Sequence, residues 1–113
     1  MIYFEKPGKA NSEATVAAAL EAAERYNIKK IVVASAKGDT AKKFLNCGHE
    51  VTVVTHQCGF KERGTQEFSE DLRRKLTAYG MNVLTTTHFL AGADRSLNFK
   101  FGGIYPAELI AHT

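Results

Sequence analysis

A short polar loop follows the apolar run Ile31–Ala34, and its residue types suit the binding of an anion. It contributes two hydroxyls, an ammonium group and a glycine, from Ser35, Thr40, Lys37 and Gly38. In a strand-loop-helix, backbone N–H groups and the positive end of the helix dipole face a common point. The loop therefore predicts a phosphate or carboxylate site. The pattern is not that of a P-loop, and Asp39 places a carboxylate in the same positive field, so an ordinary capped turn is the alternative.

Two further polar segments follow predicted strands. Thr55 and His56 lie at the end of the run Val51–Thr55, and Thr87 and His88 come after a shorter run at Val83 and Leu84. The carboxyl ends of parallel strands meet at one edge of a sheet, where α/β proteins collect their ligands. We therefore expect these side chains to line a crevice together with Ser35–Thr40. For each histidine taken alone, a surface or hydrogen-bonding role is favoured over a catalytic one, and only the two together indicate a polar pocket.

The predicted loop from His56 to Gly64 carries two cations, Lys61 and Arg63, and ends in a glycine. With Gly59 and Gly64 as hinges, it could fold over a ligand and bring positive charge to a phosphate. A solvated loop is the alternative. Arg95 and Lys100, near two phenylalanines, could act in a similar way.

A metal site is not expected. His56, Cys58 and His88 do not have the usual spacing of zinc ligands, and no Cys-x-x-Cys pair exists. A nucleophilic Cys58 beside a histidine is a weaker interpretation than a small loop residue.

The composition predicts one globular domain over residues 1–113. Hydrophobic residues make up 44% of the chain, charged residues 24%, and the net charge is +3. Because basic and acidic residues are interleaved, we expect no nucleic-acid partner. No apolar run approaches the roughly 18 residues of a membrane span, so we expect no membrane partner. Two cysteines, Cys47 and Cys58, form no disulfide framework, which favours a cytoplasmic protein.

The hydrophobic pattern alternates between strand and helix along the chain. The run Ile31–Ala34 lacks polar alternation and predicts a strand buried on both faces. Alternating strands and helices with short connections predict the α/β class and parallel pairing. The full set of expected elements is a strand at Ile2–Phe4, a helix with the stripe Val16, Leu20, Ala23 and Tyr26, the strand Ile31–Ala34, a helix over Thr40–Cys47, the strand Val51–Thr55, a helix capped by Thr65 with the stripe Phe68, Leu72, Leu76 and Tyr79, a strand at Val83–Leu84, and a helix with Pro106 near its start.

Several motifs in a fixed order resemble the pyruvate kinase C-terminal-domain-like family along nearly the whole chain. They are Lys6-Pro7-Gly8 with Asn11 and Glu13, Val32–Ser35 with Gly38–Ala41, Val54-Thr55-His56 with Gly59-Phe60 and Gly64, and Phe101-Gly102-Gly103 with Pro106-Ala107-Glu108. The resemblance implies a three-layer α/β/α domain with a mostly parallel sheet. It also implies a phosphate-gripping loop like Ser35–Thr40 and, from one relative, a bound flavin mononucleotide (FMN).

These observations predict a domain that binds a phosphorylated small molecule or nucleotide, with FMN favoured, at the carboxyl edge of its strands. One alternative is an enzyme that acts on a phosphorylated substrate with His56 or His88 as general base. The other is an assembly half-domain. The resembling family continues with two further strands, so we expect Ile31–Ala34 to be a sheet edge. The chain is then expected to form a homo-oligomer or to need a complementing C-terminal half.

Overall fold

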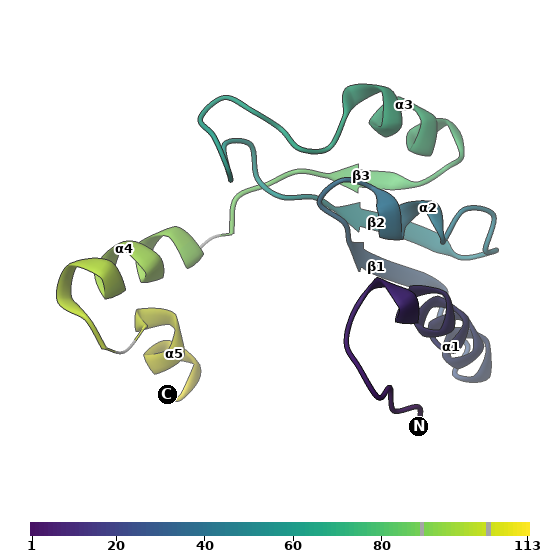
Figure 1. Cartoon of the computed structure of the whole chain (residues 1–113), viewed down its shortest axis with the longest axis horizontal. Coiled ribbons are helices and arrows are strands. Elements are labelled where there is room, and N and C mark those ends of the chain that lie inside the picture. The colour runs from purple at the N-terminus through teal and green to yellow at the C-terminus, as the bar shows by residue number, and fades with distance from the viewer. Residues whose placement is uncertain (89, 104) are drawn as a thin grey trace.

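The structure, a computed structural model, describes residues 1–88, 90–103 and 105–113. Three parallel strands lie side by side in the order β1 (Lys30–Ala34), β2 (Glu50–Val54) and β3 (Asn82–Leu84), with Val33 opposite Val53 and Val53 opposite Val83. The α/β class and the parallel pairing are confirmed (Figure 1). The elements are a 3-10 helix η1 (Lys9–Asn11), α1 (Ser12–Arg25), β1 (Lys30–Ala34), α2 (Asp39–Lys42), β2 (Glu50–Val54), α3 (Glu70–Ala78), β3 (Asn82–Leu84), α4 (Ala91–Phe101) and α5 (Pro106–Ala111).

The hydrophobic core lies on one face of this sheet. Because side chains alternate along a strand, Val33, Val51 and Val53 share that face, and all three are buried. They belong to one core cluster with side chains from α1, α2, α3 and the turns beside these helices, namely Val16, Ala41, Phe44, Phe68, Leu76 and Met81. The described residues thus form two of the three layers that the family resemblance implies.

The opposite face of the sheet is exposed in the part of the chain that the structure describes. Val32 is 71% exposed and Leu84 is 47% exposed. The prediction that Ile31–Ala34 is buried on both faces is therefore wrong, because α1, α2 and α3 all contribute to the same core. The expected position of this strand at a sheet edge is confirmed, since β1 pairs only with β2 among the described residues.

The sequence also predicts one strand and one helix end that the structure does not have, and it places two tyrosines in the core that are exposed. Ile2–Phe4 forms no strand, and its side chains are exposed. The helix expected over Thr40–Cys47 ends at Lys42 and continues as turns, in which Asn46 has a positive φ of 55°. In the two helical stripes, Tyr26 and Tyr79 project into solvent instead of the core.

Helix α3 starts later than expected. Ser69, not Thr65, occupies its N-cap, and the Ser69 hydroxyl accepts a hydrogen bond from the Leu72 backbone N–H. Thr65 instead donates its hydroxyl proton to the Glu62 carbonyl, which closes a turn. The connection between β2 and α3 is consequently longer than predicted, and this added length supplies part of the site described below.

Helices α4 and α5 pack on one another away from the sheet (Figure 1). The Asp94 carboxylate joins them by accepting a hydrogen bond from the Ala107 N–H at 2.8 Å. Pro106 is the first residue of α5, as expected. Within the part of the chain that the structure describes, no helix has the length and apolar character needed to cross a bilayer.

Candidate functional site

A pocket of about 270 Å³ lies between the loop that follows β2 and the first turn of α4. It is at the carboxyl edge of the sheet, where the sequence predicts a crevice. Its lining residues are His56, Gln57, Phe60, His88, Ala91, Gly92 and Arg95. The structure thus brings together the two histidines that follow β2 and β3.

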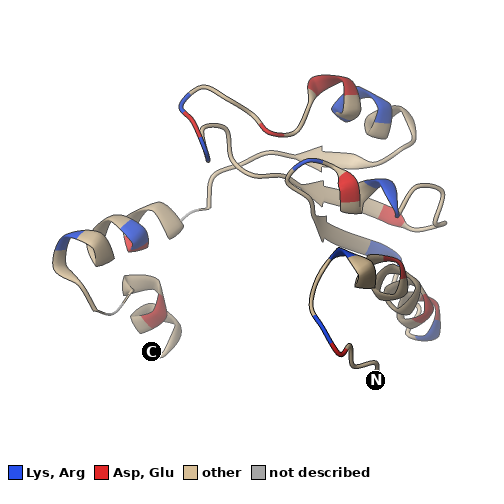
Figure 2. Cartoon of the chain, in the orientation of Figure 1, with Lys and Arg blue, Asp and Glu red and all other residues tan. Residues whose placement is uncertain are grey.

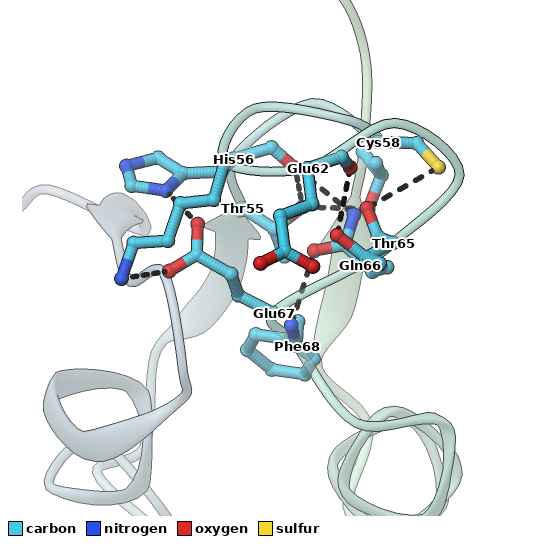
Figure 3. Close-up of polar contacts among 10 residues, drawn as sticks. Thr55, His56, Cys58, Glu62, Thr65, Gln66, Glu67 and Phe68 are labelled. Atoms are coloured by element: carbon cyan, nitrogen blue, oxygen red, sulfur yellow. Dashed lines mark hydrogen bonds and ion pairs between the residues drawn. The ribbon is translucent and has the colours of Figure 1, made fainter.

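His56 is held by a carboxylate from the far end of the same loop. Its Nδ1 lies 2.6 Å from Glu67 Oε2, and the other oxygen, Oε1, lies 3.2 Å from Lys61 Nζ. Figure 3 shows the Glu67 carboxylate directed at the imidazole from below the loop. The Glu67 side chain is only 12% exposed, so little water competes for these contacts. The result is a three-membered polar cluster, His56–Glu67–Lys61.

The Glu67 carboxyl has a lowered pKa, chiefly because of its hydrogen bond with His56 and further because of Lys61; desolvation opposes these effects. A carboxyl whose pKa is lower in the folded state contributes stability above its unfolded pKa and loses that contribution as pH falls through the folded value. Glu67 is therefore an anion at neutral pH. When the pH falls below the usual range of a carboxyl pKa, Glu67 takes up a proton, and the charge that binds His56 and Lys61 is lost.

The ring of Phe60 lies beside the cluster and forms part of the pocket wall. Its centroid is 4.0 Å from that of His56, and Arg95 Cζ is 6.0 Å from the Phe60 centroid. The pocket therefore combines flat aromatic surface with a guanidinium group. Figure 2 shows basic and acidic residues alternating along the loop after β2, and acidic residues followed by basic ones on α3.

A directed chain of hydrogen bonds fixes the strand ends next to the pocket. A guanidinium group only donates, so Arg73 Nη2 donates to Thr85 Oγ1 at 2.5 Å. The Thr85 hydroxyl is then free to donate to Thr55 Oγ1 at 2.6 Å, and Thr55 donates to the His56 carbonyl at 2.9 Å. Gln66 Nε2 donates to the same carbonyl at 3.0 Å. The backbone of His56 is thus tied to both α3 and β3.

Two residues of the loop Ser35–Thr40, namely Ser35 and Gly38, are buried and have contacts within the domain. The buried Ser35 hydroxyl accepts a hydrogen bond from the Ala41 N–H at 3.3 Å, so one donor of the short helix α2 already has a partner. Gly38 is buried with a φ of +94°, and a Cβ there would collide with the Leu72 side chain of α3. Packing against α3 therefore explains this glycine without any ligand.

The predicted site residues divide into two groups. His56 and His88 line the pocket, while Thr55 supports it through the hydrogen-bond chain. The others are absent from its lining: Ser35, Lys37, Gly38, Thr40, Gly64 and Thr87. Lys37, Gly64 and Thr87 are exposed. Gly64 has a φ of +75° with open space at its Cβ position, consistent with a turn.

Four residues that matter here were not predicted from the sequence: Glu67, Gln66, Arg73 and Gln57. Glu67 and Gln66 lie in a segment for which the sequence predicts a helix. Their contacts with His56 depend on the loop conformation, which hydrophobic periodicity does not predict. Arg73 resembles any other charged residue on the exposed side of a helix.

Within residues 1–88, 90–103 and 105–113, no group of three or more His, Cys, Asp and Glu side chains is arranged to hold a metal ion.

The fold and the position of the pocket define an α/β domain with a crevice of mixed polar and apolar lining at the carboxyl edge of its parallel strands. Comparison with protein-family models matches residues 13–113 to the family described as the pyruvate kinase alpha/beta domain. The chain belongs to this family.

Proposed function

We propose that this domain binds a phosphorylated small molecule, with FMN the favoured ligand, in the pocket beside His56. The observation that carries the proposal is the joint lining by Arg95, the two histidines and the first turn of α4. The N-terminal end of a helix favours negative charge, and a guanidinium group binds phosphate in a bidentate way. The ring of Phe60 and the imidazole stacked on it supply surface for a flat heterocycle.

The residues that line the pocket suit both the phosphate and the isoalloxazine ring of FMN. Arg95 would hold the phosphate, and Phe60 would contact the isoalloxazine ring. Ser35–Thr40 stays a second candidate for the phosphate, through the Thr40 hydroxyl and the Lys37 ammonium group. The flavin, when bound, would supply redox or light-absorbing chemistry to the domain.

The first test is direct. An absorption spectrum and a mass spectrum of freshly purified protein should reveal a flavin, and added FMN should shift the imidazole NMR signals of both His56 and His88. Arg95→Gln should weaken FMN binding by about tenfold or more, since a hydrogen bond to a charged group contributes roughly 1.5–3 kcal/mol. Calorimetric titration measures this loss.

Two control variants locate the phosphate. Lys100→Gln removes a cation from the same helix but outside the pocket lining, and it should leave FMN affinity unchanged. Thr40→Ala should also have little effect if Arg95 holds the phosphate. If Thr40→Ala weakens binding and Arg95→Gln does not, the phosphate binds at the loop after β1. If FMN, inorganic phosphate and other phosphorylated ligands leave both histidines unmoved, the proposal is wrong.

A specific observation also favours an assembly role. Among the described residues, β1 pairs only with β2, and Val32 and Leu84 are exposed on the face of the sheet opposite the core. Such an edge and face promote pairing with another chain. We propose that a second copy of this chain covers them when the purified polypeptide is alone in solution.

Light scattering after size exclusion tests this assembly. The chain should elute as a dimer, and Val32→Glu should convert it to a monomer without loss of folding, because Val32 is 71% exposed. Tyr79→Glu, a matched exposed position at the end of α3, should leave the dimer intact. A monomeric parent at micromolar concentration with cooperative unfolding would overturn the proposal.

A further inference from the structure

The two nitrogens of the His56 imidazole have different surroundings. Nδ1 lies 2.6 Å from Glu67 Oε2, whereas no partner for Nε2 occurs among the described residues. An ionised carboxylate can only accept a hydrogen bond, so Nδ1 must carry the proton. In the neutral imidazole, Nε2 then holds the lone pair, on a ring that lines the pocket.

Another histidine of the same chain shows what a purely structural histidine looks like here. Both ring nitrogens of His49 have partners: Nδ1 lies 3.0 Å from the Ile28 carbonyl, and Nε2 lies 3.1 Å from Glu24 Oε1. Its side chain is 6% exposed, compared with 39% for His56. His49 links α1 to the turn before β2, and it has no nitrogen left for a ligand. His56 differs in both respects.

The orientation of His56 is fixed from several sides. Glu67 holds Nδ1, the ring of Phe60 stacks at 4.0 Å, and Thr55 and Gln66 both donate to the His56 carbonyl. Lys61 in turn holds the second oxygen of Glu67. A carboxylate–imidazole pair held in one orientation is the arrangement that general-base catalysis requires, because the carboxylate stabilises the imidazolium that forms.

We propose that His56 is a proton-accepting residue, with Glu67 as its positioning residue, for an anionic small-molecule substrate bound in this pocket beside Arg95. The proposal rests on the proposed anion binding. The lone pair on Nε2 takes a proton from an O–H or C–H bond of the substrate, and the electron pair of that bond stays on the substrate. The other proton stays on Nδ1, which donates its hydrogen bond to the Glu67 carboxylate throughout. The step needs no oxidant or reductant.

The tautomer of His56 can be measured directly by long-range ¹H–¹⁵N NMR at a pH where the imidazole is neutral. The parent chain should show the Nδ1–H form. Glu67→Met should shift the ratio toward Nε2–H by about tenfold or more, the effect of losing one charge-assisted hydrogen bond. Glu62→Met, on the exposed part of the same loop, should leave it unchanged. An Nε2–H tautomer in the parent overturns the proposal.

A chemical probe tests whether Nε2 is available and reactive. The Nε2 lone pair attacks a carbonyl carbon of diethyl pyrocarbonate, and ethyl carbonate leaves; the acylated ring loses its Nδ1 proton, and ethyl carbonate takes up a proton and decomposes to carbon dioxide and ethanol. Mass spectrometry should show His56 modified faster than the exposed His88 and His112, and several-fold more slowly in Glu67→Met but not in Glu62→Met. A rate for His56 no higher than for the two exposed histidines overturns the proposal.

Inorganic phosphate and FMN separate this proposal from the binding proposal. Millimolar amounts of either should protect His56 from diethyl pyrocarbonate, and Arg95→Gln should abolish the protection. If the tautomer and the reactivity are as expected but neither anion protects, anion binding in this pocket is refuted, and with it the substrate class assigned to His56. If protection occurs but the tautomer is wrong, only the proton-accepting role is refuted.

Discussion

Replacement of Gly38 by alanine should lower the free energy of unfolding more than any other glycine-to-alanine change in this chain. Gly38 has a φ of +94°, a conformation that costs an L-residue about 1–2 kcal/mol. A Cβ at this position would also overlap Leu72 Cδ2 and lie 3.3 Å from Leu72 Cγ and 3.4 Å from Phe68 Cε2. Overpacking of this kind adds roughly 1–3 kcal/mol.

Gly48→Ala is the matched control. Gly48 has a φ of +82° but no atom within 4 Å of its Cβ position, so alanine there costs only the backbone part. Urea unfolding of both variants measures the difference between them. Truncation of the neighbour, in the double variant Gly38→Ala with Leu72→Ala, should recover part of the loss through a coupling between the two sites. Equal losses at Gly38 and Gly48 would show that packing against α3 does not explain the glycine.

The packing of Gly38 against α3 bears on the proposed ligand site as well as on stability. From the sequence, the glycine in Ser35–Thr40 suggests close approach of a phosphate to the backbone. In the structure, the helix that approaches this backbone is α3. Gly38 is therefore not evidence for a ligand site. A Gly38 variant would lose binding through unfolding, so it would not test whether this residue contacts a ligand. Thr40→Ala and Arg95→Gln are the informative changes.

The parts of the fold that depend on local pattern could be predicted from the sequence. The three apolar runs predict β1, β2 and β3, and each predicted end lies within one residue of the observed end, because runs of β-branched and apolar residues favour strands. The carboxyl-edge location of the pocket follows from their parallel pairing. His56 and His88 could be predicted for the same reason, since each follows a strand of this sheet.

The remaining features depend on contacts that leave no local signal. Glu67 reaches His56 from eleven positions further along the chain, across an irregular loop, and neither spacing nor periodicity marks the pair. The exposure of Val32 depends on all three helices packing on the other face, which an apolar run does not reveal. Thr65 and Ser69 are both acceptable helix caps by residue type, and the turn that Thr65 closes with Glu62 decides between them.

The second large effect is expected at Arg73, the start of the hydrogen-bond chain that ends at the His56 carbonyl. Arg73 Nη1 donates to the Val83 carbonyl at 3.0 Å, and Nη2 donates to Thr85 Oγ1 at 2.5 Å. Its side chain is 26% exposed, so water replaces these contacts poorly. Loss of hydrogen bonds from a charged group costs roughly 1.5–3 kcal/mol, and Arg73→Met should destabilise the domain by about this amount.

The adjacent residue supplies the control. Arg74 is 74% exposed and has one long contact, 3.6 Å to Glu70, so Arg74→Met should change stability by no more than about 0.5 kcal/mol. Both variants remove one positive charge from the same turn of α3, so their difference in urea unfolding measures the hydrogen bonds of Arg73 to Val83 and Thr85 together with its contact 5.9 Å from the Phe68 centroid. Thr85→Ser should keep the chain of hydroxyls, whereas Thr85→Val should break it and shift the NMR signals of His56. If Arg73→Met and Arg74→Met unfold at the same urea concentration, the chain from Arg73 does not stabilise the strand ends, and the orientation of His56 depends on Glu67 and Gln66 instead.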